Sequence, residues 1–438
     1  MGELTPYWQS DDGRYVLYCG DVLDVLSRLP DETFQMCLTS PPYWALRSYL
    51  DEDDPLKGRE YGLEETPEQY VERLVGVFDE VRRTLRADGV VFLNLGDSYA
   101  GSGKGRNRDG THQEGGKQGT SRGTIDGLLY KTETSGGLKP KDLVGIPWRT
   151  AFALQAVGWW LRSEIIWAKG VSGQKTVEEA VYQALVAADI QSEQIDAVME
   201  QLDVYVGNPM IESCRDRPTR AHEHIFLLAK SRRYYYDTAY MQEPAKYPDD
   251  KRKPYAPGQV DKRGNGHDRG GGSIRKNAIP YRNNRDVWQI PTKGYKGAHF
   301  ATFPITLITA PILAGSAARS CVGCGAPWAR VVQRGNSEHH CRPGCGCKEK
   351  EGQMQNWSEG YRGYGGFSNT AVFTEDFTPS CRCGVDEHEP STVLDPFAGS
   401  GTTGVVAYNC GRKFVGIELN REYCDLAVER FKAECGGS

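Results

Sequence analysis

Short apolar runs alternate with amphipathic segments along much of the chain, and this alternation predicts buried strands followed by helices. The apolar runs predict strands at residues 15–21, 34–39, 90–94, 159–167, 222–228, 391–395 and 413–418, with a further strand at 233–236. The amphipathic segments predict helices at residues 22–29, 66–81, 147–157, 305–313, 402–410 and 420–433. Repeated strand–helix alternation indicates an α/β fold built on a single sheet.

One of these helices carries a well-defined start signal. Thr66 is expected to cap it, with Pro67 in the first turn and Gln69 completing a capping box. Apolar residues at helical spacing predict the face that packs against the protein, and these are Leu74, Val75, Phe78 and Val81.

Three segments interrupt the pattern. Residues 101–137 are rich in glycine, serine and basic residues without periodicity, which predicts a mobile loop. Residues 175–204 predict an inserted helical hairpin, interpreted as a stabilising flap, with a dimer or DNA-phosphate contact as the alternative. Residues 245–286 are polar and glycine-rich, and ten Lys or Arg against four Asp between 249 and 285 make them locally basic. Such a segment is suited to following a phosphate backbone.

Composition sets further bounds. The 438 residues suffice for one large or two medium domains, and the net charge of −5 gives no overall attraction to nucleic acid. No apolar stretch approaches the ~20 residues of a membrane span, and residues 1–10 show no signal peptide, so we expect no membrane contact. Seven of the thirteen cysteines fall within 321–383, which favours metal ligands over disulfides and a cytoplasmic location.

A glycine-rich turn stands near the end of the sequence. The strand ending at Asp395 is followed by Pro-Phe-Ala-Gly-Ser-Gly and a helix, and the next strand ends at Glu418. This strand–turn–helix–strand unit is used to hold nucleotide-like ligands. Two strands do not make a doubly wound sheet, so the remaining strands are expected from earlier in the chain. The sheet is therefore predicted to be circularly permuted.

A second motif, Thr39-Ser40-Pro41-Pro42-Tyr43-Trp44, follows the strand at 34–39. An exocyclic amine on a nucleobase is a poor nucleophile because its lone pair is delocalised into the ring. The Ser40 hydroxyl and the Pro41 carbonyl, aimed by consecutive prolines, could accept both amine hydrogens and localise that pair. Tyr43 offers an aromatic face for a base flipped out of the duplex. Taken alone, the motif is also compatible with a simple turn or a polyproline ligand.

Together, and in this order, the two motifs resemble those of the β-class DNA amino-methyltransferases of bacterial and phage restriction–modification systems. The resemblance covers most of residues 12–310 and 391–434. It implies a circularly permuted, Rossmann-like methyltransferase sheet with an inserted DNA-recognition region, to which the cysteine spacing described below adds a small zinc-ribbon-like insertion. It also implies an enzyme that transfers methyl groups from S-adenosylmethionine.

Ser40 and Trp44 resemble the cytosine-N4 enzymes more than the adenine-N6 enzymes, which usually carry Asp at the first position. The resemblance therefore implies a site-specific cytosine-N4 methyltransferase, with adenine-N6 methylation as the alternative. A catalytically silent nucleic-acid-binding protein is less favoured because both motifs are intact. A C5-cytosine enzyme is disfavoured because the chain has no Pro-Cys dipeptide.

The resemblance also assigns cofactor residues. The glycine turn implies contacts with S-adenosylmethionine from Asp395, Phe397, Gly399, Gly401 and Thr402. Glu418 matches the acid that binds the ribose hydroxyls, and Asp21 matches the acid near the adenine amine. The segment 299–304 resembles the one that lines the methionine end, which implicates Phe300 and Thr302.

Residues 245–286 occupy the place of the family's target-recognition region, with 101–137 expected to close over double-stranded DNA. Lys251 and Lys253 are expected to contact phosphates, and Arg275, Arg282 and Arg285 to read bases. A cognate restriction endonuclease is a possible partner, and both a monomer and a dimer remain open. The predicted division of the chain is 12–244 for the catalytic half, 245–286 for target recognition, 287–320 for cofactor lining, 321–385 for the zinc-ribbon-like insertion, and 391–434 for the cofactor-binding half.

The cysteines fall into short-spaced pairs. Cys321 and Cys324 form one pair and Cys381 and Cys383 a second, a pattern typical of one structural zinc site. Free surface thiols are the alternative. A second site could be formed by Cys341, Cys345, Cys347 and His340.

Overall fold

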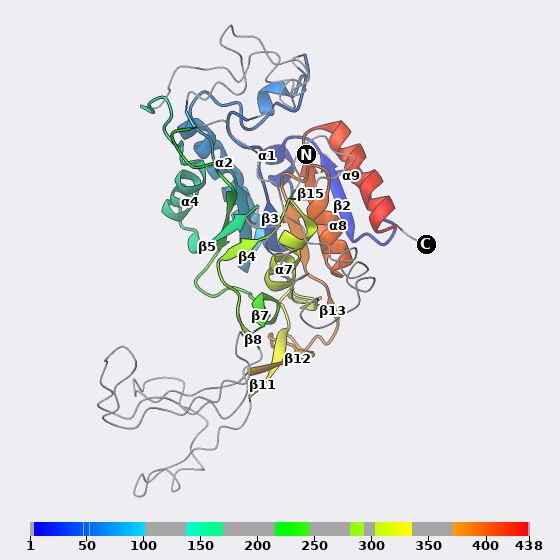
Figure 1. The fold of residues 1–438 in the computed structure, drawn as a ribbon. Helices are drawn as coiled ribbons and strands as arrows, with labels where there is room; N and C mark the ends of the chain where they lie inside the picture. The colour runs from blue at the N-terminus through cyan, green and yellow to red at the C-terminus, as the bar shows by residue number, and fades with distance from the viewer. Residues whose placement is uncertain are drawn as a thin grey trace, which may run out of the picture. The chain divides into compact units, whose positions relative to one another are not determined.

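The computed structural model (Figure 1) describes the following residues: 4–46, 48–51, 53–100, 137–169, 215–244, 281–292, 303–334 and 371–436. The chain divides into two compact units. The larger unit comprises Met1–Tyr240, Arg285–Trp328 and Pro379–Ser438, and the smaller unit comprises Met241–Asn284 and Ala329–Thr378. Among the described helices, none is long and apolar enough to cross a membrane.

A nine-stranded mixed sheet forms the centre of the larger unit. The two strands nearest the C-terminus are inserted between strands from the start of the chain, and all four run parallel, with Leu394 opposite Cys37 and Val415 opposite Val16. The predicted circular permutation is therefore confirmed. In spatial order the strands are β1 (Trp8–Gln9), β2 (Tyr15–Cys19), β15 (Lys413–Glu418), β14 (Thr392–Asp395), β3 (Phe34–Thr39), β4 (Leu85–Leu95), β6 (His222–Ala229), β5 (Trp160–Ala168) and β9 (Val287–Gln289).

Strand β6 is antiparallel to both of its neighbours, β4 and β5. This arrangement explains why the strand predicted at 233–236 is wrong. Both edges of β6 are already paired, and after β6 the chain turns, with the Ser231 hydroxyl donating to the Arg233 carbonyl over 2.6 Å. The backbone bonds that follow, from Tyr235 N to Asp88 O (2.9 Å) and from Asp237 N to Ala314 O (2.8 Å), reach two different elements and so do not make a ladder.

Helices cover both faces of the sheet (Figure 1). On one face, α1, α2 and α4 pack over a core that includes Phe78, Leu93 and Phe226. On the other face, α7, α8 and α9 contact the strands and one another. The helices are α1 (Val22–Leu26), α2 (Pro67–Thr84), α4 (Ile146–Ala156), α7 (Ile305–Gly315), α8 (Thr402–Asn409) and α9 (Arg421–Glu434). This three-layer α/β arrangement confirms the predicted fold class.

The start of α2 is the predicted capping box. Gln69 N donates to Thr66 Oγ1 and Thr66 N donates to Gln69 Oε1, each over 3.1 Å. These bonds satisfy amide groups that have no partner within the helix. Leu74, Phe78 and Val81 are fully buried on the predicted apolar face.

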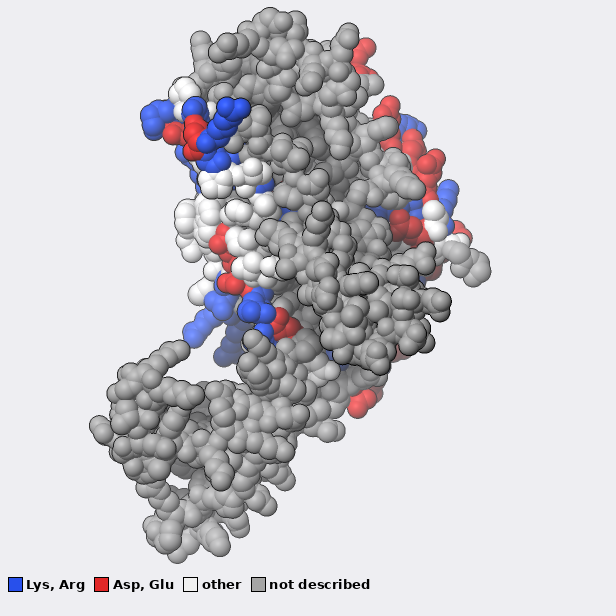
Figure 2. All heavy atoms as spheres, viewed as in Figure 1, with Lys and Arg blue, Asp and Glu red and all other residues white. Residues whose placement is uncertain are grey.

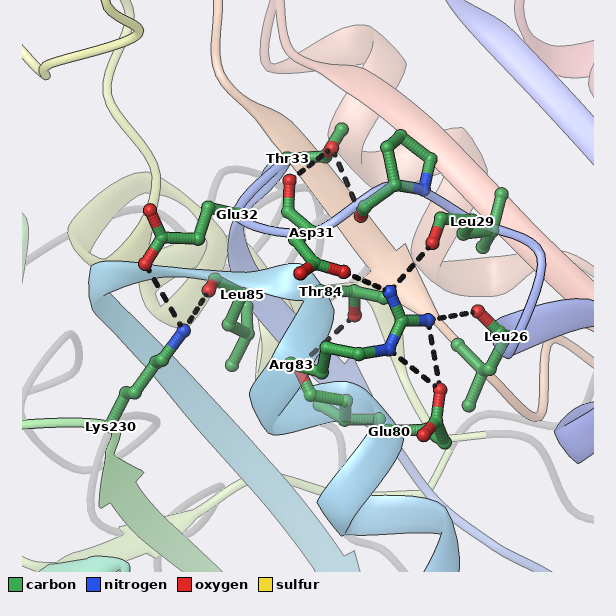
Figure 3. A network of polar contacts seen from close by, with 12 residues as sticks. Leu26, Leu29, Asp31, Glu32, Thr33, Glu80, Arg83, Thr84, Leu85 and Lys230 are labelled. Carbon is green, nitrogen blue, oxygen red and sulfur yellow. Dashed lines mark hydrogen bonds and ion pairs between the residues drawn. The ribbon is translucent and has the colours of Figure 1, made fainter.

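The end of α2 is tied to the loop that enters β3 (Figure 3). The Arg83 guanidinium donates to the carbonyls of Leu26 (2.6 Å) and Leu29 (2.9 Å), and it pairs with Asp31 and Glu80. Backbone bonds continue the connection, including Thr33 N to Thr84 O at 2.7 Å. Because β3 leads directly to Ser40, these contacts help to fix the start of the strand that carries the predicted catalytic motif.

Three two-stranded sheets complete the described structure: β10 (Ser320–Cys321) with β13 (His388–Glu389), β11 (Ala329–Arg334) with β12 (Ala371–Thr378), and β7 (Gln242–Pro244) with β8 (Tyr281–Asn283). The last two belong to the smaller unit. The predicted hairpin at 175–204 and nearly all of the loop at 101–137 lie outside the described residues, as do 245–280 of the predicted target-recognition region.

Candidate active site

The predicted cofactor and catalytic motifs meet at one edge of the sheet. Strands β2, β15, β14 and β3 are parallel, so their carboxyl ends lie side by side. These ends deliver Gly20, Glu418, Asp395 and Ser40, respectively. The Gly20 amide donates to the Glu418 carbonyl over 2.9 Å, which joins two of the ends directly. In open α/β sheets this is the edge where ligands bind.

The glycine turn after β14 depends on two left-handed residues. Gly399 has φ of 52° and Gly401 has φ of 76°, a region that side-chain-bearing residues rarely adopt. A Cβ atom on Gly401 would lie 2.8 Å from the Tyr15 hydroxyl oxygen. A Cβ atom on Gly399 would meet no protein atom within 4 Å, so the turn presents open space above its backbone. That space suits a ligand that approaches the main chain closely.

Asp395 fixes the turn through hydrogen bonds on its buried side. Its buried carboxylate accepts hydrogen bonds from Thr39 Oγ1 (2.7 Å), Thr403 Oγ1 (2.6 Å) and Phe397 N (3.1 Å). Burial raises its pKa to about 6, while these hydrogen bonds act in the opposite direction. Asp395 therefore links β14 to β3 and to α8, and its carboxylate oxygens are engaged within the protein.

Glu418 lies at the end of β15, beside the turn. One carboxylate oxygen accepts from Gly399 N and the other from Asn420 N, both at 2.8 Å. Burial raises the pKa of Glu418 to about 7. Each oxygen keeps further acceptor capacity, so the group is able to receive ribose hydroxyls while staying oriented by the backbone.

Of the remaining predicted cofactor residues, three have partners within the protein and two lie outside the described residues. Asp21 is buried and caps α1 by accepting from Leu23 N (3.0 Å) and Asp24 N (3.1 Å). The Phe397 ring packs against Tyr61 with centroids 5.3 Å apart. Thr402 Oγ1 accepts from Arg430 over 2.7 Å. Phe300 and Thr302 lie outside the described residues.

Ser40 follows β3 with its hydroxyl in a polar cluster. Asn94 Nδ2 donates to Ser40 Oγ over 3.3 Å, and Ser40 Oγ donates to the Tyr43 hydroxyl over 3.4 Å. The loop is further held by the Tyr70 hydroxyl, which donates to the Pro42 carbonyl over 2.7 Å. Among the described residues, no hydrogen bond reaches the Pro41 carbonyl.

Tyr43 is more constrained than an open stacking platform. Its hydroxyl donates to Glu223 Oε2 over 2.7 Å and accepts from Asn94 Nδ2 over 2.9 Å. A Cβ atom on Gly96 would lie only 2.4 Å from the ring, so ring and backbone are in close contact. Burial, and next the Glu223 charge, raise the pKa of Tyr43 well above its ordinary value. The phenol therefore stays protonated and anchors the loop.

Sequence reasoning missed three residues of this cluster: Asn94 at the end of β4, Glu223 in β6 and Lys169 after β5. The Lys169 ammonium pairs with Glu223 Oε1, and Asn94 Nδ2 donates to Glu223 Oε2 over 2.9 Å. The sequence does carry a signal for two of them, because Asn94 and Glu223 are polar residues at one end of the apolar runs that form β4 and β6. Asn94 Oδ1 is buried without a hydrogen-bond partner in the described part of the chain.

The predicted DNA contacts are only partly described. Arg282 Nε pairs with Glu243 over 2.8 Å within the smaller unit, and Arg285 precedes β9. Lys251, Lys253 and Arg275 lie outside the described residues. Figure 2 shows basic side chains gathered at the upper and the middle left of the view with mostly uncharged described surface between them, and others mixed with acidic side chains at the right.

The predicted zinc ligands do come together. The sulfur atoms of all four lie within 4.8 Å of one another, and they belong to Cys321, Cys324, Cys381 and Cys383. The candidates for a second site lie outside the described residues.

A permuted α/β sheet with a glycine turn and a Ser-Pro-Pro-Tyr loop at one edge is the arrangement of a methyltransferase of the S-adenosylmethionine-dependent class. The family model described as DNA methylase matches residues 34–322 and 387–429, and the chain belongs to this family of amino-methyltransferases of restriction–modification systems.

Relatives that match nearly the whole chain include two bacterial type II methyltransferases. The type II methyltransferase M.Cfr9I of Citrobacter freundii is 33% identical over 419 residues, covering 95% of this chain and 88% of the relative. The type II methyltransferase M.SmaI of Serratia marcescens is 33% identical over 411 residues, covering 94% and 88%. Among solved structures, the PvuII cytosine-N4-specific DNA methyltransferase matches with a TM-score of 0.46 at 15% identity, covering 97% of this chain and 88% of that chain.

Proposed function

We propose that the protein methylates the exocyclic N4 amine of a cytosine flipped out of a specific double-stranded DNA sequence. The observation that carries the choice of base is Ser40, which stands where adenine-N6 enzymes of the resembling class usually carry Asp. Its neutral hydroxyl lies at the carboxyl edge of the sheet, beside Asn94 and Tyr43.

Ser40 Oγ and the Pro41 carbonyl are proposed to accept the two amine hydrogens. Ser40 Oγ receives one hydrogen bond from Asn94 and donates one to Tyr43, so one acceptor lone pair remains. The Pro41 carbonyl has no competing donor among the described residues. Two acceptors on one amine favour a pyramidal nitrogen whose lone pair is directed toward an electrophile.

The cofactor is proposed to lie over the glycine turn, with its ribose at Glu418. The open space above Gly399 and the remaining acceptor capacity of Glu418 both fit such a ligand. When bound, S-adenosylmethionine supplies a methyl group on a positively charged sulfur that departs as a neutral thioether. The protein then contributes proximity and orientation, which account for much of the rate in such direct transfers.

Asn94, Glu223 and Lys169 are proposed to position the loop. Glu223 anchors the Tyr43 hydroxyl, and Lys169 compensates the buried carboxylate. A buried charge without a partner would be costly, so the three groups form one unit. Their role is to hold Ser40 and Tyr43 in place, without direct contact with the reacting atoms.

Residues 245–286 are proposed to read the DNA sequence. The catalytic loop contacts only the flipped base, so another part of the chain must recognise the surrounding bases. The locally basic composition of this segment supports that role. Arg282 would have to exchange its Glu243 partner for a base edge on binding.

The deciding experiment is nucleoside mass spectrometry of DNA methylated by the purified enzyme. N4-methylcytosine is the expected product. N6-methyladenine as the sole product would assign the enzyme to the adenine-N6 class. If no duplex became methylated, the interpretation as a catalytically silent nucleic-acid-binding protein would be correct.

A further inference from the structure

Two short loops bring the four cysteines together. The first is Cys321-Val-Gly-Cys324-Gly325 and the second is Cys381-Arg-Cys383-Gly384. Each closes with a left-handed glycine, with φ of 68° at Gly325 and 70° at Gly384. Pairing of β10 with β13 places Cys321 opposite His388 and holds the two loops beside each other.

The sulfur positions fit a tetrahedral metal. Cys383 Sγ lies 3.2 Å from Cys321 Sγ, 3.7 Å from Cys324 Sγ and 3.2 Å from Cys381 Sγ. Zinc–sulfur bonds of about 2.3 Å in a tetrahedron separate the sulfurs by about 3.8 Å, whereas a disulfide requires about 2.05 Å. All four thiols are free, and their spacing is that of ligands around a shared ion.

We propose that Cys321, Cys324, Cys381 and Cys383 hold one structural zinc ion. Four protein thiolates close the coordination sphere and leave no open position for a water or substrate. The location agrees with a structural role. The cluster adjoins the amino end of β14, because the hydroxyl of Ser320, the residue before Cys321, is hydrogen-bonded to the Ser391 hydroxyl over 2.7 Å. The catalytic motifs lie at the opposite, carboxyl end of that strand.

The ion would clamp both ends of the segment 329–378. Cys324 lies just before β11 and Cys381 lies just after β12, the two strands at which this segment begins and ends. Two protein contacts join the two sides of the clamp directly. Ser380 Oγ donates to Pro327 O over 2.6 Å, and the Trp328 ring packs against His388 at 4.8 Å. The zinc is therefore inferred to fix where the inserted segment leaves and rejoins the catalytic unit.

The test is metal analysis of the full-length protein, purified under reducing conditions without chelator. C324S and C383S are each expected to contain one zinc equivalent less than the wild type, and the control C410S to match it. Cys410 lies at the end of α8, outside the cluster. Variants that retain the wild-type amount of zinc, or a wild type with less than one equivalent, would overturn the proposal. A disulfide between any two of the four, detected by non-reducing mass spectrometry, would overturn it as well.

A second readout distinguishes the clamp from a general folding effect. Replacement of the metal by cobalt should give the thiolate-to-cobalt charge-transfer absorption of a tetrahedral sulfur site. Metal removal from the wild type should speed proteolysis within 325–380 at least tenfold while calorimetric affinity for S-adenosylmethionine changes by less than twofold. No cobalt spectrum, or equal proteolysis with and without metal, would contradict the clamp.

Discussion

The Tyr43 hydroxyl donates a 2.7 Å hydrogen bond to Glu223 Oε2, although 180 residues separate the two in the chain. This bond connects the loop after β3 to β6, and Asn94 and Lys169 complete the cluster on the intervening and following strands. The proposed catalytic loop is thus held by a charge pair, Lys169 and the buried Glu223, that belongs to neither of the two motifs found in the sequence.

E223Q should lower turnover by roughly 10- to 100-fold with little change in cofactor affinity. Glutamine keeps an acceptor for Tyr43 but removes the charge, which leaves Lys169 without its partner; a hydrogen bond to a charged group contributes about 1.5–3 kcal/mol. Turnover on a duplex substrate and calorimetry with S-adenosylmethionine measure the two effects separately. E68Q, which alters an exposed carboxylate paired with Arg149, is the control and should behave as wild type. A parallel fall in cofactor affinity would refute the positioning role.

S40A should reduce single-turnover methylation more strongly than Y43F, on the order of 100-fold against 10-fold. S40A removes a proposed hydrogen-bond acceptor of the amine, and this raises the free energy of the transition state. Y43F keeps the packed ring and removes only the anchor to Glu223. Both variants should bind S-adenosylmethionine as tightly as the wild type. If Y43F proved the slower enzyme, the phenol itself would act on the substrate.

Cofactor affinity should rise with pH up to about 7. Burial raises the pKa of Glu418 to about 7, so below that pH the free protein carries a protonated acid. Ribose hydroxyls donate to the carboxylate, so binding must release the proton, and affinity should fall by up to about tenfold per pH unit below the pKa. E418Q should bind more weakly by about 1–3 kcal/mol and lose this pH dependence. Binding of S-adenosylmethionine to the wild type and to E418Q is measured in the same buffers. The difference between the two proteins then excludes any effect of ionisation of the cofactor itself.

The raised pKa of Glu418 affects the free energy of unfolding of the cofactor-free protein in the opposite direction to cofactor affinity. The folded pKa of Glu418 lies above the ordinary value of about 4.3, so the folded state binds more protons between these values. The contribution of Glu418 to the free energy of unfolding should therefore decrease as pH rises from about 4 to about 7. Denaturant unfolding of wild type and E418Q across this range measures it, and equal slopes for the two would contradict the assignment.

G399A and G401A form a matched pair. Both place an L-residue in the left-handed region, at a cost of about 1–2 kcal/mol of stability. Only G401A also brings a Cβ atom within 2.8 Å of the Tyr15 hydroxyl oxygen, so it should lose a further 1–3 kcal/mol, roughly. G399A should instead lower cofactor affinity at least tenfold, because its Cβ enters the open space above the turn. Wild-type affinity in G399A would place the cofactor elsewhere.

Exchange of residues 245–286 for the matching segment of a related methyltransferase should change the methylated sequence and leave cofactor affinity intact. Base-reading arginines would contribute about 1–3 kcal/mol of discrimination each. Sequencing of the methylated DNA by a method that detects modified bases gives the result. Retention of the original site by an active chimera would move recognition to another segment, with 175–204 the next candidate.

Local chemistry was readable from the sequence. The capping box of Thr66 and Gln69, the glycine turn at Gly399 and Gly401, and the apolar runs of β3 and β15 each depend on neighbouring residues, and the structure contains them where the pattern predicted. The predicted strand at 233–236 was wrong because strand formation needs a free neighbouring edge, and both edges of β6 are occupied.

The order of the motifs along the chain was enough to predict the permuted sheet and the kind of reaction. The sequence did not reveal that Asp395 is bound by Thr39 or that Tyr43 is bound by Glu223. Those partners lie on different strands, and a hydrogen bond between them exists only once the sheet has set the strand order and register. Side chains far apart in sequence acquire their roles from that packing, because a buried carboxylate is stabilised by whichever donors the fold brings within about 3 Å of it.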